Sequence, residues 1–161
     1  MAKEAKTNAM RMLERAKVAY TSHEYPHEEG QAVDGANVAR LTGQDPARVF
    51  KTLVTQGADR NYYVFVVPVL AELDLKKAAK AAGIKSVAMI HVADINKVTG
   101  YIRGGCSPVG MKKQFPTVFH ATAADLPTIM VSAGRIGRQV QCDPKDLLAL
   151  LGAKTADIIV E

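Results

Sequence analysis

A single lysine, Lys51, lies within the apolar run from Val49 to Val54. In a strand, Lys51 shares a face with Val49 and Leu53, and the opposite face is also largely apolar. That pattern is typical of a strand inside a sheet. A lysine there costs solvation free energy unless a carboxylate, a carbonyl cluster or an anionic ligand meets its ammonium group. Three interpretations follow: a buried ion pair, a side chain that reaches water past its packed stem, or a cation directed into a pocket.

Two glycine-containing segments are the next candidates for a ligand site. In Gly104-Gly105-Cys106-Ser107-Pro108 the paired glycines allow positive φ and a close approach of backbone to ligand. The segment 132–137 (Ser-Ala-Gly-Arg-Ile-Gly) follows a predicted strand and has a similar composition. A tight turn is the commoner use of such glycines, and the spacing of a Walker phosphate loop is absent.

The spacing of the remaining reactive residues disfavours a nucleophile or a metal. Cys106 has no histidine tied to it by a motif, and a small buried thiol is the commoner role. His23 and His27 would lie about 13 Å apart on a strand, too far to share one ion through bonds of about 2 Å. Acidic residues occur where helix caps and solvated faces are expected, as at Asp125, Asp143 and Asp146. We therefore expect no metal and no cofactor.

The charge balance favours an anionic partner. The net charge is +5 and the isoelectric point is near 9.2. A phosphate-binding surface could be assembled from Lys76, Lys77, Lys80, Lys85, Arg103, Lys112 and Lys113. For any one of them, a solvated helix face is the simpler interpretation.

The bulk properties indicate one globular domain. A chain of 161 residues can bury a full core without metal or disulfide support. The N-terminal residues lack the apolar stretch of a signal peptide, and no segment reaches the roughly 18 apolar residues needed to span a bilayer. We expect a cytoplasmic protein that does not bind membranes.

The chemistry-bearing residues are positioned by short, mixed elements. The clearest is a hairpin of strands 49–55 and 62–67. In helix 74–82, Leu75, Ala78, Ala79 and Ala82 are expected to face the core. The other predicted helices span 7–17, 37–41, 94–98 and 143–151, and the other strands 20–25, 87–90, 117–120, 128–132, 139–141 and 158–160. This order predicts an α+β fold with a central, mostly antiparallel, partly barrel-like sheet surrounded by helices.

Taken together, four motifs resemble a known family. They are Phe50-Lys51-Thr52-Leu53, Leu75-Lys76-Lys77-Ala78-Ala79, the run from Thr99 to Gly110, and Val131-Ser132-Ala133-Gly134. In this order and at these intervals they resemble the YbaK/EbsC-type aminoacyl-tRNA deacylases, relatives of the editing domain of bacterial prolyl-tRNA synthetases. The resemblance covers nearly the whole chain, which we interpret as one editing domain, residues 1–161.

The resemblance implies a pocket for the aminoacylated 3′ end of a tRNA. Lys51 would be its essential cation, and substrate-binding positions would be Tyr25, Thr52, Gly104, Gly105, Ser107, Ser132, Gly134 and Gln139. Gln139 stands where relatives can carry an acidic residue, so we expect no charge-based role for it. Cys106 replaces what is more usually an aliphatic residue, which argues against a catalytic thiol.

The family chemistry implies removal of Cys from Cys-tRNA(Pro) and Cys-tRNA(Cys), with prolyl-tRNA synthetase as a possible partner. The substrate thiol would attack its own ester, so that the enzyme needs only to orient the substrate and stabilise charge. Two alternatives stay open: hydrolysis of Ala- or Ser-charged tRNA in the same fold, and a non-catalytic module that binds tRNA or nucleotides. The sequence does not indicate an oligomeric state.

Overall fold

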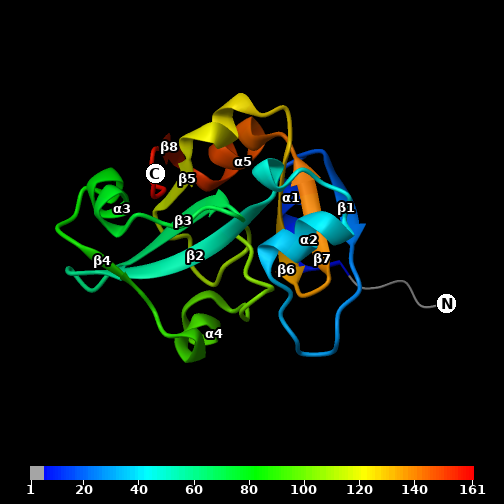
Figure 1. The fold of residues 1–161 in the computed structure, drawn as a ribbon, viewed down its shortest axis with the longest axis horizontal. Helices are drawn as coiled ribbons and strands as arrows, with labels where there is room; N and C mark the ends of the chain where they lie inside the picture. Colours follow the sequence, from blue (N-terminus) through cyan, green and yellow to red (C-terminus); the bar gives the residue numbers. More distant parts are fainter. Residues whose placement is uncertain (1–5) are drawn as a thin grey trace.

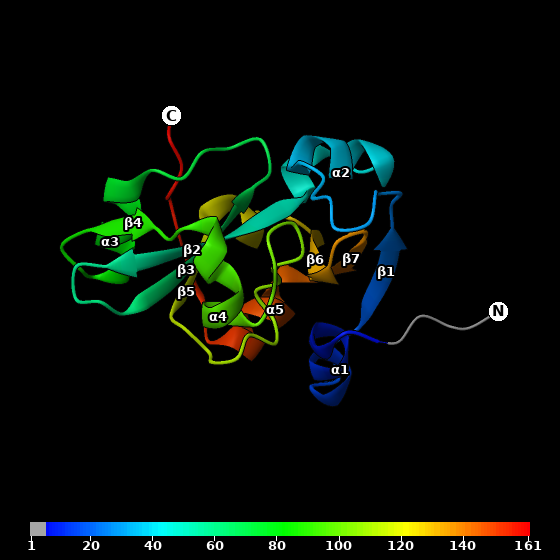
Figure 2. The same ribbon diagram turned by 90° about the horizontal axis from the view of Figure 1, so that it is seen from below.

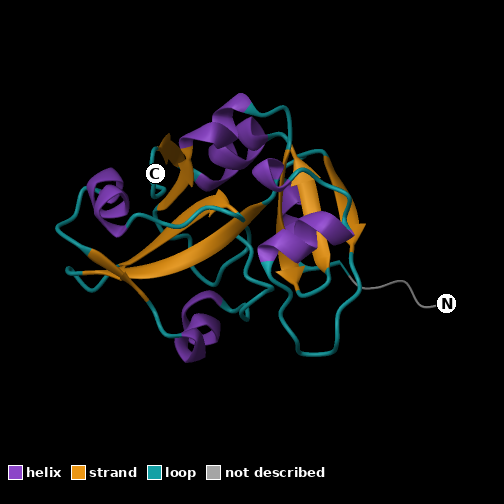
Figure 3. Cartoon of the chain, in the orientation of Figure 1, coloured by secondary structure: helices purple, strands orange, loops and turns teal. Residues whose placement is uncertain are grey.

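The computed structural model describes residues 6–161, which form two β-sheets flanked by helices (Figures 1 and 3). The three-stranded sheet has the order β1-β7-β6 and is antiparallel, with β1 (Tyr20–Glu24), β6 (Ile129–Arg135) and β7 (Arg138–Cys142). The five-stranded sheet has the order β4-β2-β3-β5-β8, with β2 (Phe50–Gly57), β3 (Tyr62–Pro68), β4 (Val87–Met89), β5 (Thr117–His120) and β8 (Lys154–Ala156).

The two strands of the predicted hairpin, β2 and β3, lie in the interior of the five-stranded sheet. β2 pairs antiparallel with β3, so that Lys51 is opposite Val67 and Gln56 is opposite Tyr62. β4 is antiparallel to β2, whereas the β3–β5 and β5–β8 pairs are parallel. The α+β class is confirmed, although the strands are divided between two sheets instead of forming one. Within residues 6–161 these sheets do not close into a barrel; a single bridge between Val49 and Met130 links them.

The five helices of residues 6–161 lie close to the predicted ranges. They are α1 (Asn8–Arg15), α2 (Gly35–Leu41), α3 (Leu75–Ala82), α4 (Ile95–Thr99) and α5 (Pro144–Leu151). The ends of α3 and α5 coincide with the capping residues that the sequence indicates. Asp74 accepts hydrogen bonds from the first turn of α3, and Gly83 ends this helix with φ +74°. Within residues 6–161, three short 3-10 helices accompany these elements: η1 (Pro46–Arg48), η2 (Val92–Asp94) and η3 (Ala121–Asp125).

Each of the two sheets has helices on both of its faces. α3 packs on one face of the β2–β3 hairpin and α4 lies on the other (Figure 1). α1 and α2 lie on opposite faces of the three-stranded sheet, as the view from below shows (Figure 2). The largest apolar core includes Phe50, Val64, Phe119 and Leu147.

Two details of the predicted pattern were wrong. Leu75 is 42% exposed because α3 packs on the sheet through residues 78–82, and Leu75 begins the helix before that contact. The last strand is Lys154–Ala156 and not 158–160. Ile158 is fully buried, but its N–H donates to His120 Nδ1 (3.3 Å) instead of joining a strand ladder.

In the part of the chain that the structure describes, none of the helices has the length and apolar character to cross a bilayer.

Candidate active site

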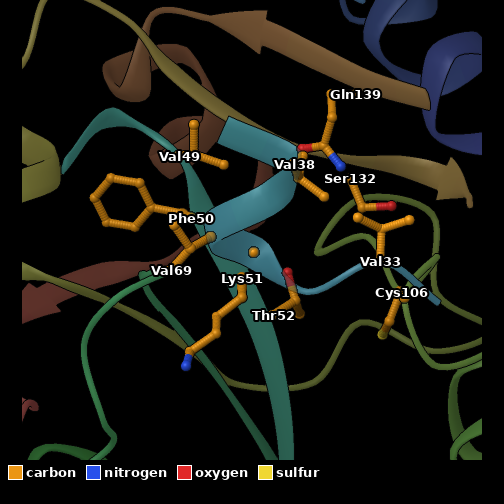
Figure 4. Close-up of a pocket in the computed structure, with 12 residues that line it drawn as sticks. Val33, Val38, Val49, Phe50, Lys51, Thr52, Val69, Cys106, Ser132 and Gln139 are labelled. Carbon is orange, nitrogen blue, oxygen red and sulfur yellow. The ribbon is translucent and has the colours of Figure 1, made fainter. Parts of the chain in front are cut away.

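A cavity of about 110 Å³ lies where the two sheets meet. The start of β2 forms one side, and α2, the loop before it, the 104–106 segment and the β6–β7 pair form the others (Figure 4). Its lining consists of Val33, Gly35, Val38, Val49, Phe50, Lys51, Thr52, Val69, Gly104, Cys106, Ser132 and Gln139. The structure thus brings together five of the predicted site residues: Lys51, Thr52, Gly104, Ser132 and Gln139.

The cavity is narrow because its apolar wall is tightly packed. Val33, Val38, Val49 and Val69 contribute branched side chains. Gly35 fits only without a side chain, since a Cβ there would lie 2.6 Å from Val69 Cγ1. Pockets for drug-sized molecules usually measure about 300–1,000 Å³, so this cavity suits a group of a few heavy atoms.

Lys51 supplies the positive charge of the cavity. The side chain is partly buried, and among residues 6–161 no carboxylate forms an ion pair with its ammonium group. Burial lowers the pKa of Lys51 below 10.5, and the more distant charge of Glu72 offsets this only in part. Of the three interpretations given for Lys51, the buried ion pair finds no partner within residues 6–161, while a cation directed into a pocket and a side chain that reaches water both stay open.

The cavity also carries polar groups, from β2 and from the β6–β7 pair, that have no partner in the described chain. Thr52 Oγ1 and Gln139 Oε1 are buried and form no hydrogen bond within residues 6–161. Ser132 is opposite Gln139 in the β6–β7 pairing, and its Oγ accepts from Gly134 N at 3.1 Å. In Figure 4 the Lys51 side chain extends away from Ser132 and Gln139. Because buried polar atoms are nearly always paired, Thr52 Oγ1 and Gln139 Oε1, which lack a partner among residues 6–161, are free to bind a ligand or an ordered water.

The 104–106 segment closes the cavity without supplying an activated nucleophile. Gly104 has φ +82°, and a Cβ there would lie 2.7 Å from Ala32 Cβ, so the conformation requires glycine. Burial raises the pKa of Cys106 to about 11. The Cys106 thiol is therefore protonated at neutral pH, which agrees with the expectation that it is not the nucleophile.

The other four predicted site residues lie outside this cavity. Tyr25 and Gly134 line a second cavity of about 400 Å³, and the buried Tyr25 hydroxyl has no hydrogen-bond partner in the described chain. Gly105 packs against the backbone of Arg135, where a Cβ would be 3.1 Å from the Arg135 Cα. Ser107 is fully buried and accepts from Val109 N at 3.2 Å, so it shapes the turn.

Sequence reasoning missed the apolar half of the cavity. Val33 and Gly35 lie in a stretch for which no helix or strand was predicted, and Val38 lies in a short predicted helix (37–41) with no assigned role. The one local signal was Asp34, whose carboxylate accepts from Asn37 N and starts α2 beside the cavity.

Across residues 6–161, no group of three or more His, Cys, Asp or Glu side chains could hold a metal ion.

The fold and this site define a class of protein: an α+β protein with a small, cationic, partly apolar pocket between two sheets. The model of the aminoacyl-tRNA editing domain matches residues 29–150. The chain belongs to that family.

Individual relatives agree with this assignment. A protein of Enterococcus faecalis, named as a candidate Cys-tRNA(Pro)/Cys-tRNA(Cys) deacylase, EbsC, is 48% identical over 153 residues, which is 95% of this chain and 93% of the relative. A solved structure of a candidate trans-editing enzyme for prolyl-tRNA synthetase has a TM-score of 0.81 at 25% identity, with 96% of both chains covered. The solved structure of hypothetical protein APE2540 has a TM-score of 0.84 at 19% identity, covering 96% of this chain and 100% of that one, and supports the fold alone.

Proposed function

We propose that this chain is a trans-editing aminoacyl-tRNA deacylase that removes cysteine from Cys-tRNA(Pro) and Cys-tRNA(Cys). The family assignment and the 48% identical relative support the reaction class. The observation that carries the proposal is Lys51, a partly buried cation beside a small cavity with no ion-paired carboxylate in residues 6–161. We regard residues 1–161 as one editing domain that acts in the cytoplasm and without a cofactor.

The cavity suits the aminoacyl group better than the nucleotide. Its volume of about 110 Å³ accommodates a small side chain and an ester, whereas the tRNA must lie outside. The net charge of +5 favours binding of the polyanionic tRNA outside the cavity. The apolar wall of valines would contact the Cys side chain, and the unpaired Thr52 Oγ1 and Gln139 Oε1 would bind its polar groups.

The chemistry requires orientation and charge stabilisation. The substrate thiol attacks its own ester carbonyl, so that a C–S bond forms, the C–O bond to the ribose breaks, and the thiol proton passes to the leaving ribose oxygen. A thiolactone and deacylated tRNA result. Lys51 would stabilise the negative charge that develops on the ester and leaving oxygens. Thr52, Ser132 and Gln139 would hold the acyl group close to the geometry of attack.

The remaining predicted residues would act around this centre. Gly104 would allow the acyl group close to the backbone, while Gly105 and Ser107 would maintain the loop. Tyr25 and Gly134, in the second cavity, would contact the terminal nucleoside. Prolyl-tRNA synthetase is the partner that could deliver mischarged tRNA(Pro).

The test is a deacylation panel with Cys-, Ser- and Ala-tRNA(Pro). We expect rapid release of cysteine as thiolactone and much slower release of serine, because a hydroxyl cyclises far less readily than a thiol. Equal rates for serine and cysteine would favour hydrolysis by bound water. Binding of all three tRNAs without turnover would contradict the enzyme assignment and favour the binding-module alternative.

A further inference from the structure

A third hollow among the described residues is separate from the candidate active site. It measures about 670 Å³ and lies at the turn of the β2–β3 hairpin, between that turn, α4 and the chain that follows α4. Its lining consists of Arg60, Asn61, Tyr62, Tyr63, Lys97, Val98, Lys112, Lys113, Gln114, Phe115 and Pro116. We call this hollow the basic groove. Four of its side chains are cationic and none is acidic.

The cations of the basic groove are exposed, and few are neutralised. Lys97 pairs with Asp94 at 3.1 Å, and the Lys112 ammonium donates to the Lys97 carbonyl at 3.4 Å. Within residues 6–161, neither Arg60 nor Lys113 forms an ion pair. The remaining nearby carboxylate, Asp59 in the hairpin turn, accepts from the Tyr63 hydroxyl at 2.6 Å. The basic groove therefore carries a net positive charge that is available to a ligand.

The floor of the basic groove is aromatic. The rings of Tyr62 and Phe115 pack edge to face, with centroids 5.6 Å apart, and Tyr62 keeps part of its surface exposed. Cations interleaved with aromatic side chains suit nucleic acid, because phosphates contact the cations and bases or sugars contact the rings.

One segment connects the basic groove with the candidate active site. Residues 100–116 contribute Gly104 and Cys106 to the active-site cavity and Lys112 to Pro116 to the basic groove. The middle of the segment is held by hydrogen bonds from Tyr101 Oη to Val109 O (2.6 Å) and from Asn8 Nδ2 to Gly110 O (2.8 Å). In Figure 2 this segment runs from α4, in front of the hairpin, towards β6.

The separation of the two sites matches a short length of RNA. Lys51 lies at the active-site end of β2, and Gln56, opposite Tyr62, lies at the groove end. Five residues of strand span about 17 Å. If the RNA has the spacing of one strand of a B-form duplex, about 3.4 Å per nucleotide, this length corresponds to about five stacked nucleotides.

We propose that the basic groove binds the sugar–phosphate backbone of the substrate tRNA, near the junction of its single-stranded 3′ end with the acceptor stem. The inference rests on the proposed function, because it places the acyl group in the active-site cavity. Arg60, Lys112 and Lys113 contact phosphates, and the Tyr62 ring supports an adjacent sugar or base. The groove thereby supplies affinity for tRNA and leaves the chemistry to the other site.

The experiment compares a variant with Arg60→Gln, Lys112→Gln and Lys113→Gln against a matched control with Lys76→Gln, Lys80→Gln and Lys85→Gln. The control removes three exposed cations from α3 and the turn after it, on the other face of the hairpin. Binding of an uncharged tRNA transcript is measured from 0.05 to 0.5 M salt. Deacylation is measured with Cys-tRNA(Pro) and with the cysteinyl ester of adenosine, which cannot reach the groove. Circular dichroism and thermal melting check the fold of each variant.

The logarithm of the tRNA association constant falls linearly with the logarithm of the salt concentration. Loss of three phosphate contacts makes this slope less steep by about 2, which corresponds to about 100-fold weaker binding at 0.1 M salt. We expect that change for the groove variant and little change for the control. We also expect the groove variant to raise KM for Cys-tRNA(Pro) while the rate with the adenosine ester is unchanged. If the groove variant binds tRNA with wild-type affinity and with the wild-type salt slope, the proposal is overturned. That result would mean that the groove does not bind tRNA, and an acidic protein would then be the alternative occupant. If wild-type protein cleaves neither ester, the proposed function fails, whereas the binding experiment still decides the role of the groove.

Discussion

Replacing Lys51 with methionine should separate catalysis from stability. Met keeps most of the length of the apolar stem and removes the charge. Since burial lowers the pKa of Lys51 in the folded state, the unfolded chain binds the proton more tightly, and the charged side chain opposes folding at neutral pH. Among residues 6–161 no ion-paired carboxylate would be left without its partner. We therefore expect Lys51→Met to melt at the same temperature as wild type or slightly higher.

The same change should remove most of the activity. Loss of one preorganised group that stabilises transition-state charge typically lowers kcat by about 10²–10³, or about 3–4 kcal/mol of barrier. The cavity around Lys51 is small and partly apolar, so water replaces the ammonium poorly. We expect kcat/KM for Cys-tRNA(Pro) to fall by about this factor.

The matched control is Lys77→Met. Lys77 donates to Asp157 (3.1 Å) and to the Ile159 carbonyl (2.9 Å), and the hydrogen bond to Asp157 raises its pKa. The charge on Lys77 therefore stabilises the fold at pH values below its pKa, and this stabilisation is lost as the pH rises through it. We expect Lys77→Met to melt at a lower temperature than wild type and to keep its activity.

The assay is release of labelled cysteine from Cys-tRNA(Pro), with melting followed by circular dichroism on the same samples. Near wild-type turnover by Lys51→Met would remove Lys51 from the mechanism. A large drop in its melting temperature would show instead that Lys51 is a structural partner, contrary to the reasoning from its environment.

Four further outcomes follow from the same site. Cys106→Ala should stay active, because a thiol with a pKa of about 11 is protonated at neutral pH; complete loss of deacylation would point to an enzyme thiolate. The kcat/KM of wild type should fall as the pH rises through the pKa of Lys51, which lies below 10.5, and a pH profile corrected for spontaneous ester hydrolysis should show this limb vanish in Lys51→Met. Thr52→Val should raise the free energy of unfolding by about 1 kcal/mol in urea denaturation, since it removes an unpaired buried hydroxyl, and should lower kcat/KM about tenfold; unchanged kinetics would exclude Thr52 from substrate binding. Gly104→Ala should destabilise the protein by about 2 kcal/mol or more, given φ +82° and the 2.7 Å approach to Ala32, and a wild-type melting curve would contradict that backbone geometry.

The elements that the sequence predicted well are those with local signals. Two apolar runs joined by a turn that contains Gly57 and Asp59 predicted the β2–β3 hairpin, and Asp74, Gly83, Asp143 and Gly152 marked the ends of α3 and α5. The apolar periodicity gave a wrong prediction where burial depends on how a helix packs on the sheet. Leu75 has the periodicity of a core residue but starts its helix before the contact with the sheet.

In the candidate site too, some features have local signals in the sequence and others depend on the folded chain. Lys51 and Gly104 carried local signals, a charge in an apolar strand and a glycine pair, which residue types alone could reveal. The unpaired state of Thr52 Oγ1 and Gln139 Oε1 could not be predicted, because it depends on which atoms the folded chain brings near them.

The sequence by itself determined the local structure, the positive charge and the unusual place of Lys51, because propensity, capping and alternation act between residues close in the chain. Only the tertiary structure decided that β2 meets the β6–β7 pair, that valines from α2 and its preceding loop wall the cavity, and that one segment links that cavity to the basic groove. These are contacts between residues far apart in the chain. Strand pairing and the packing of helices on the sheets set them, and no local pattern of residues specifies that pairing.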